Sequence, residues 1–159
     1  MIDISMRPIG KIFEQAAQPI IKEILKANVS ALTGIIRSAV IEKTPVNTGA
    51  LRNSIMEDTL EAPDGTIIGR VGTNIEYALP VEFGSRPHFP PIDPLTYWAR
   101  RKFGLSEAEA RNVAFAVAHK IAKKGTKAYR MFEHGYKEGE KQAKRISQEI
   151  GIEIEKAFK

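Results

Sequence analysis

A proline and a glycine close the longest apolar pattern in this sequence, and this boundary constrains the fold more than any other feature. The stretch KTPVNTGALRNSI (residues 43–55) follows a pattern typical of an amphipathic helix, with apolar residues spaced three and four apart. Those residues are Ile20, Ile24, Leu32, Ile35, Ile36, Ala39 and Val40. Pro45 disfavours helical geometry at the residue before it, and Gly49 can adopt a backbone conformation closed to other residues. We therefore predict a helix over about residues 19–42, then a turn and the entry to a strand.

The same apolar spacing continues upstream, at Ile9, Ile12, Phe13 and Ala16, and predicts an earlier helical part that Pro19 kinks or divides. After the corner, LRNSIMEDTLE (residues 51–61) and TIIGRVGTN (residues 66–74) read as strands around the turn Pro63-Asp64-Gly65. The two strands should form an antiparallel hairpin. Gly69 leaves room for close approach of the first helix, or marks a bulge.

The C-terminal half reads as a proline-rich loop followed by helices. Residues 77–94 contain five of the nine prolines and predict a surface loop. A short helix over residues 95–103 should turn Leu95, Trp98 and Phe103 inward. A capping box of Ser106 and Glu109 begins the next helix, and Gly125 ends it. Its apolar stripe is Ala110, Val113, Ala114, Val117 and Ile121, and a last helix carries Ala143, Ile146, Ile150, Ile154 and Ala157. The predicted class is α+β: a long N-terminal helix packed on a small antiparallel sheet, with additional helices in the C-terminal half.

The residue types give no support to an enzyme. The chain has no cysteine, and its three histidines, His88, His119 and His134, lack the spacing of metal motifs. Glu57, Asp58 and Glu61 are typical of a solvated strand edge rather than of acid–base catalysis. We predict no catalytic, cofactor or metal site. No apolar run approaches the roughly 20 residues that span a bilayer, which predicts a protein without a membrane partner.

The net charge of +5 is concentrated in one block. Residues 100–130 contain 9 basic and 2 acidic residues. The candidate basic patch consists of Arg100, Arg101, Lys102, Lys120, Lys123, Lys124 and Lys127. Such a block is commonly a solvated helix surface. The alternative function is a nucleic-acid-binding module that uses residues 100–130, with Tyr97, Trp98 and Tyr129 as stacking groups.

An ordered series of motifs resembles one family. TPVNTGALRNSI (residues 44–55) is similar to the TPVDTGxLRxSI corner of the tailed-phage tail-completion or neck proteins, also described as minor tail components and including the Mu-like virion-morphogenesis type. The similarity continues in VGTNIEYALPVEFGS (residues 71–85), in RPHFPPIDPLTYWARRKFG (residues 86–104) and in KIAKKGTKAYRMFEHGY (residues 120–136). Asn47 replaces the usual aspartate but can form the same side-chain turn.

This resemblance implies a structural virion protein of a phage or prophage. It implies a single tail-completion-like domain over residues 1–159, with a loop and helical insertion at about residues 84–125. The protein would form an oligomeric ring, a hexamer by the resemblance, at the head-proximal end of the tail for head–tail joining. Its partners would be copies of itself, tail-tube proteins and head-connector proteins, in the virion and in the host cytoplasm during assembly. Nucleic acid is not the favoured partner.

The resemblance also implies roles for individual residues. The corner would be shaped by Thr44, Pro45, Thr48, Gly49, Leu51 and Arg52. The predicted subunit interface consists of Tyr77, Ala78, Glu82, Phe83, Gly84 and Phe89. Because residues 84–94 show no apolar periodicity, we predict that Phe89 finds no helix or strand of its own subunit to pack on. The loop would then be mobile until it docks on a neighbouring subunit.

Overall fold

The computed structural model describes residues 1–6 and 18–157, and the helical positions predicted at Ile9, Ile12, Phe13 and Ala16 lie outside them. The chain divides into two compact units, which we describe separately. The first unit contains residues 1–44, 52–74 and 131–159, and the second contains residues 45–51 and 75–130. The predicted α+β class is confirmed.

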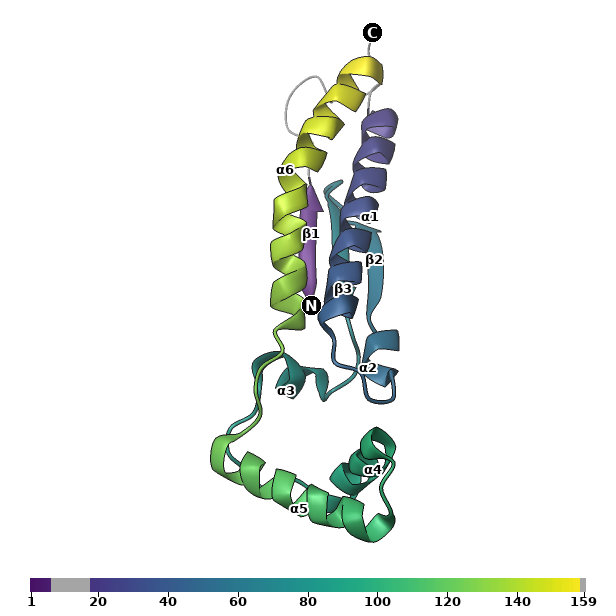
Figure 1. The fold of residues 1–159 in the computed structure, drawn as a ribbon. Coiled ribbons are helices and arrows are strands. Elements are labelled where there is room, and N and C mark those ends of the chain that lie inside the picture. The colour runs from purple at the N-terminus through teal and green to yellow at the C-terminus, as the bar shows by residue number, and fades with distance from the viewer. Residues whose placement is uncertain (7–17, 158–159) are drawn as a thin grey trace. The chain divides into compact units, whose positions relative to one another are not determined.

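The first unit consists of a three-stranded antiparallel sheet and two long helices (Figure 1). The strands β1 (Ile2–Met6), β2 (Met56–Glu61) and β3 (Ile67–Gly72) are arranged in the order β1-β3-β2. Helix α1 (Gln18–Lys43) packs against all three strands, and helix α6 (Met131–Ala157) runs beside α1. The predicted packing of a long N-terminal helix on a small sheet is therefore confirmed, as is the hairpin of β2 and β3.

Helix α1 has nearly the predicted bounds, but its buried stripe differs in the first half. The buried apolar residues are Ile21, Leu25, Val29, Leu32, Ile36, Ala39 and Val40. Ile20, which the sequence pattern placed on the apolar face, is 47% exposed, and Ile24 is only half-buried. The apolar spacing from Pro19 onward favours Ile20, whereas packing places Ile21 on the buried face.

By length and composition alone, α1 is apolar enough to cross a membrane. The prediction that no apolar run approaches this length is wrong for α1, because Lys26 and Arg37 interrupt the run without making it polar. In the structure the buried stripe packs on the sheet and on α6, which is the arrangement of a core helix.

Gly69 lies where α1 crosses the sheet. A Cβ atom at this position would collide with Thr33 Oγ1 and would lie 3.0 Å from Val29 Cγ1. The ladder is continuous here, since Gly69 pairs with both Thr59 and Ile4. Gly69 therefore provides close approach of the helix and does not mark a bulge.

Two glycines of α6 have the same role toward α1. A Cβ atom at Gly135 would collide with Val40, and one at Gly139 would collide with Ile36. Glycine lowers the helix propensity of α6 by about 1 kcal/mol at each position. The close contact with α1 is the packing that offsets this cost.

Near the sheet, one strand was not predicted and one local prediction is wrong. Residues 2–6 form a strand that the sequence did not predict, because a five-residue alternation becomes a strand only when β3 pairs with it. Residues 51–53, predicted as the start of a strand, belong to the single helical turn α2 (Ala50–Asn53). The Thr48 hydroxyl accepts a hydrogen bond from the Ala50 N–H at 3.3 Å, which favours a turn over an extended start.

The second unit contains α3 (Ala78–Phe83), α4 (Ile92–Phe103) and α5 (Glu107–Lys124). The prediction of a loop over residues 77–94 is wrong at both ends, since α3 and the start of α4 are helical. Pro80 and Pro94 each occupy the third position of a helix. Proline is tolerated there because the first-turn N–H groups have no intrahelical acceptor.

Helices α4 and α5 form a hairpin (Figure 1). Thr96 and Ala99 of α4 and three alanines of α5, Ala110, Ala114 and Ala118, are buried. Leu95 and Trp98 are half-buried and Phe103 is 53% exposed, so the predicted inward position of Phe103 is wrong. Small residues at this contact leave no room for a large ring between the helices.

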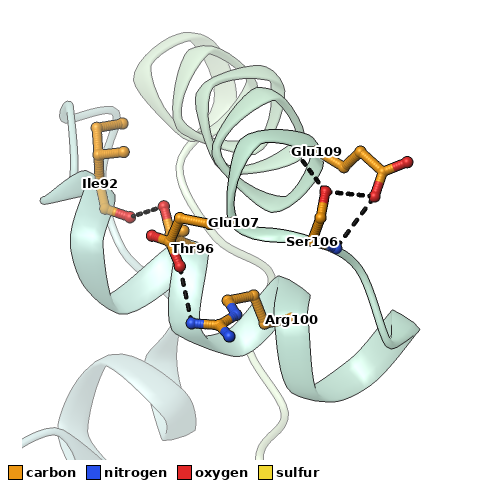
Figure 2. A network of polar contacts seen from close by, with 6 residues as sticks. All are labelled: Ile92, Thr96, Arg100, Ser106, Glu107 and Glu109. Atoms are coloured by element: carbon orange, nitrogen blue, oxygen red, sulfur yellow. Dashed lines mark hydrogen bonds and ion pairs between the residues drawn. The ribbon is translucent and has the colours of Figure 1, made fainter.

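Polar contacts fix the turn of the hairpin, as Figure 2 shows. Arg100 Nη1 lies 2.7 Å from Glu107 Oε2. The predicted capping box is confirmed: Ser106 accepts from the Glu109 N–H and donates to Glu109 Oε2 through its hydroxyl at 2.6 Å and its N–H at 3.0 Å. These hydrogen bonds from the side chain and backbone of Ser106 hold the pKa of Glu109 below its ordinary value. Gly104, with φ 66° and ψ 28°, ends α4 in the left-handed conformation.

Candidate functional site

The corner after α1 contains one buried hydroxyl, that of Thr44, and one backbone position with a positive φ, at Gly49. Thr44 is buried, and its hydroxyl donates to the Val40 carbonyl at 2.6 Å and contacts Met131 Sδ at 3.3 Å. Leu51 is buried, Pro45 and Arg52 are half-buried, and Thr48 is exposed. Among the described residues, no hydrogen-bond partner satisfies the buried Nε of Arg52. The corner therefore mainly determines how the chain leaves α1.

Gly49 has φ 85°, which confirms the positive angle predicted from its place after Asn47-Thr48. We expect Gly49→Val to lower the free energy of unfolding by about 1–3 kcal/mol, because a β-branched residue is strained in this region. Thermal unfolding followed by circular dichroism measures the effect. An unchanged melting temperature would mean that the turn does not need glycine.

In helix α3 large apolar residues are exposed and a glutamate is buried, the reverse of the usual arrangement. Ala78 and Glu82, one turn apart, are buried, and Glu82 is only 6% exposed. Leu79 and Phe83, also one turn apart, are 65% and 75% exposed, and Tyr77 before the helix is about half exposed. Glu82 has a partner within the described chain. The exposed group Tyr77, Leu79 and Phe83, here called the α3 apolar face, is the candidate contact surface.

The chain entering α6 holds α3 in place. The N–H groups of Tyr129 and Arg130 donate to the carbonyls of Val81 and Glu82 at 2.9 and 3.1 Å. The side chain of Tyr129 is about half exposed. The α3 apolar face is thus presented by a short helix whose C-terminal carbonyls are bonded to a second segment of the same unit.

Sequence reasoning missed Leu79 as a surface residue. The spacing of four between Leu79 and Phe83 is a helical signal in the sequence. Pro80 and Pro87 favour a loop instead, and the loop prediction followed them. Of the six predicted interface residues, Tyr77 and Phe83 lie on the α3 apolar face. Ala78 and Glu82 lie beneath it, and Gly84 follows it.

A bridge between Ser85 and Thr126 closes the base of the segment that carries α4 and α5. The Ser85 N–H donates to the Thr126 carbonyl at 3.3 Å, and the Thr126 N–H donates to the Ser85 carbonyl at 3.2 Å. Gly84 has φ 75° and ψ 179°, and Gly125 has φ 69° and ψ −162°, a region essentially restricted to glycine. A Cβ atom at either glycine would collide with the backbone across the bridge. Gly84 therefore serves the closure of this segment.

Phe89 packs within its own unit. Its ring meets the ring of His119 on α5 edge to face, with the centroids 5.6 Å apart. The prediction that Phe89 has no helix of its own subunit to pack on is wrong. The proline-rich segment crosses α5, and this could not be seen from local periodicity.

The basic residues lie at two places on the hairpin rather than in one patch. Arg100, Arg101 and Lys102 form the last turn of α4, next to Glu107 and Glu109 of the α5 start. Lys120, Lys123 and Lys124 lie toward the end of α5, and Lys127 follows it. At 1.5 Å per residue, Glu107 and Lys120 are about 20 Å apart along the helix.

The carboxylates do not form a metal site in the part of the chain that the structure describes. Glu57 and Glu61 alternate with Asp58 on the edge strand β2, and Glu61 pairs with Lys22 at 2.7 Å. Glu57 borders an open groove on α1 that also contacts Glu42, His134 and Glu138. A hydrogen bond from Lys141 lowers the pKa of Glu138.

Comparison with known proteins identifies the N-terminal part. No curated protein and no solved structure matches the chain significantly. Residues 9–84, which include α1, the corner, the β2–β3 hairpin and α3, match the family described as "Bacteriophage HK97-gp10, putative tail-component". The resemblance of this chain to the tail components of tailed phages is thereby confirmed over these residues.

Proposed function

We propose that this protein forms a ring at the head-proximal end of the phage tail and prepares the tail for joining to the head. Its partners in this proposal are copies of itself, tail-tube proteins and head-connector proteins, first in the host cytoplasm and then in the virion. Within this proposal residues 1–159 act as one tail-completion domain. The bridged segment that begins after Gly84 and ends at Gly125 is an insertion into it.

The observation that carries the proposal is the α3 apolar face. Large apolar side chains on the surface of a short, well-anchored helix are typical of a protein contact when they lie together. Leu79 and Phe83 share one side of α3, and Tyr77 adjoins them. In a head-to-tail ring every subunit would cover this face with the same surface of its neighbour, so a single contact satisfies all copies.

The family match supports the same conclusion, because α3 lies inside the matched residues 9–84. A tail component acts through contacts with other structural proteins, and the α3 apolar face supplies such a contact. The face combines aromatic and aliphatic groups, the composition that interface centres favour.

We expect the double variant Leu79→Glu/Phe83→Glu to lose self-association. Burying two carboxylates in a contact without partners is strongly unfavourable, so the association constant should fall by at least about 100-fold. Sedimentation velocity over a range of protein concentrations measures the change. Phe103→Glu on α4 is the control, since Phe103 is also an exposed large apolar residue but lies outside the face. An unchanged distribution of species in the double variant would contradict the proposed contact.

A further inference from the structure

One row of side chains on the outer side of α5 combines cations and aromatic rings. Arg111, Phe115, His119 and Lys123 are spaced four residues apart, so they follow one another along the same side of the helix. All four are exposed, whereas Ala110, Ala114 and Ala118 face the hairpin interior. We call these four residues the α5 ridge. Lys120 and Lys124 lie beside it.

Both acids of α5, Glu107 and Glu109, lie in its first turn, and the helix beyond them carries positive charge only. From Ala110 to Arg130 the sequence contains six lysines and arginines and no aspartate or glutamate. Among the residues that the structure describes, no ion pair joins Arg111, Lys120 or Lys123 to a carboxylate. The cations at the end of α4 differ, because Arg100 is paired with Glu107. The unneutralised charge therefore lies along α5.

The aromatic rings of this region are already engaged within the chain. The Arg111 guanidinium lies 5.8 Å from the centroid of Phe115, and Phe89 meets His119 edge to face. On α4, Arg101 lies over Tyr97 and Lys102 over Trp98. Ring faces covered by cations are not available to stack on unpaired bases. Lys120, Lys123 and Lys124 take part in none of these ring contacts, so their ammonium groups can contact phosphates.

We propose that the α5 ridge, with Lys120 and Lys124, binds the phosphate backbone of double-stranded DNA without reading its sequence. A helix that presents cations along one side can contact successive phosphates of a duplex, and phosphate contacts from lysine and arginine supply sequence-independent affinity. The surface lies outside the family-matched residues 9–84 and is independent of the α3 apolar face. In a ring that assembled through the α3 apolar face, the α5 ridge would remain uncovered and could contact DNA.

Fluorescence anisotropy with a labelled duplex oligonucleotide, from about 50 to 200 mM salt, tests this inference. We expect the logarithm of the binding constant to fall linearly with the logarithm of salt concentration, and the double variant Lys120→Ala/Lys123→Ala to reduce the slope by about 2. The matched control is Lys144→Ala/Lys156→Ala on α6, which removes the same charge from exposed positions in the other unit. The control should leave the slope unchanged.

Three results would overturn the proposal. One is a binding constant that does not depend on salt. Another is an equal loss of affinity in the α5 variant and the α6 control, because the affinity would then depend only on the net charge of the protein. The third is preference for another polyanion: tighter binding to a single strand of the same length, or equal competition by poly-glutamate at matched charge.

Discussion

Gly125→Ala is expected to cause one of the two largest losses of stability, about 3 kcal/mol or more, because two costs act at the same position. The backbone of Gly125, with φ 69° and ψ −162°, lies in a region that costs other residues about 1–3 kcal/mol. The added Cβ atom would also collide with the Ser85 carbonyl oxygen, which belongs to the backbone and cannot rotate away. Opening the bridge would release both backbone hydrogen bonds between Ser85 and Thr126 and the contacts of the Ser85 hydroxyl with Thr126.

For a chain of this size each kcal/mol corresponds to about 2–4 °C, so the melting temperature should fall by about 6–12 °C. Differential scanning calorimetry measures it, and hydrogen exchange at the amides of Ser85 and Thr126 shows whether the bridge has opened. Gly104→Ala is the matched control. Gly104 also has a positive φ, 66°, but a Cβ atom there meets nothing within 4 Å. If both substitutions cost the same, the collision across the bridge contributes nothing.

Gly69→Ala is expected to destabilise the first unit by about 1–3 kcal/mol, because it forces α1 away from β3. The added Cβ atom would collide with the hydroxyl of Thr33, which is completely buried and bonded to the Val29 carbonyl at 2.7 Å. The neighbouring Val29 side chain is also close. Urea unfolding measures the free-energy change.

A double-mutant cycle isolates the contact. Thr33→Ala removes the colliding atom, so the double variant Thr33→Ala/Gly69→Ala should be more stable than the sum of the single effects predicts. Gly72→Ala on the same strand is the control, since its Cβ atom would meet only the Met1 side chain at ordinary distances of 3.6–3.9 Å. Strict additivity at Gly69 and Thr33 would show that close approach of α1 is not the reason for the glycine.

The sequence determined the features that depend on short-range chemistry. Proline, glycine and capping residues act within a few positions, so the end of α1, the β2–β3 turn, the α5 capping box and the positive φ of Gly49 followed from local rules. The motif at residues 44–55 likewise carried the resemblance that the family match over residues 9–84 confirms.

Only the tertiary structure decided which surfaces are covered. The identity of β1 as a strand depends on β3, and the exposure of Leu79 and Phe83 depends on Ala78 and Glu82 facing inward. The ring of Phe89 contacts the ring of His119, which lies 30 positions later in the sequence. The Ser85–Thr126 bridge joins the segment after Gly84 to the segment after Gly125. Such contacts join residues whose separation along the chain carries no periodic signal. Their geometry is determined by packing, and a single sequence does not contain it in any local pattern.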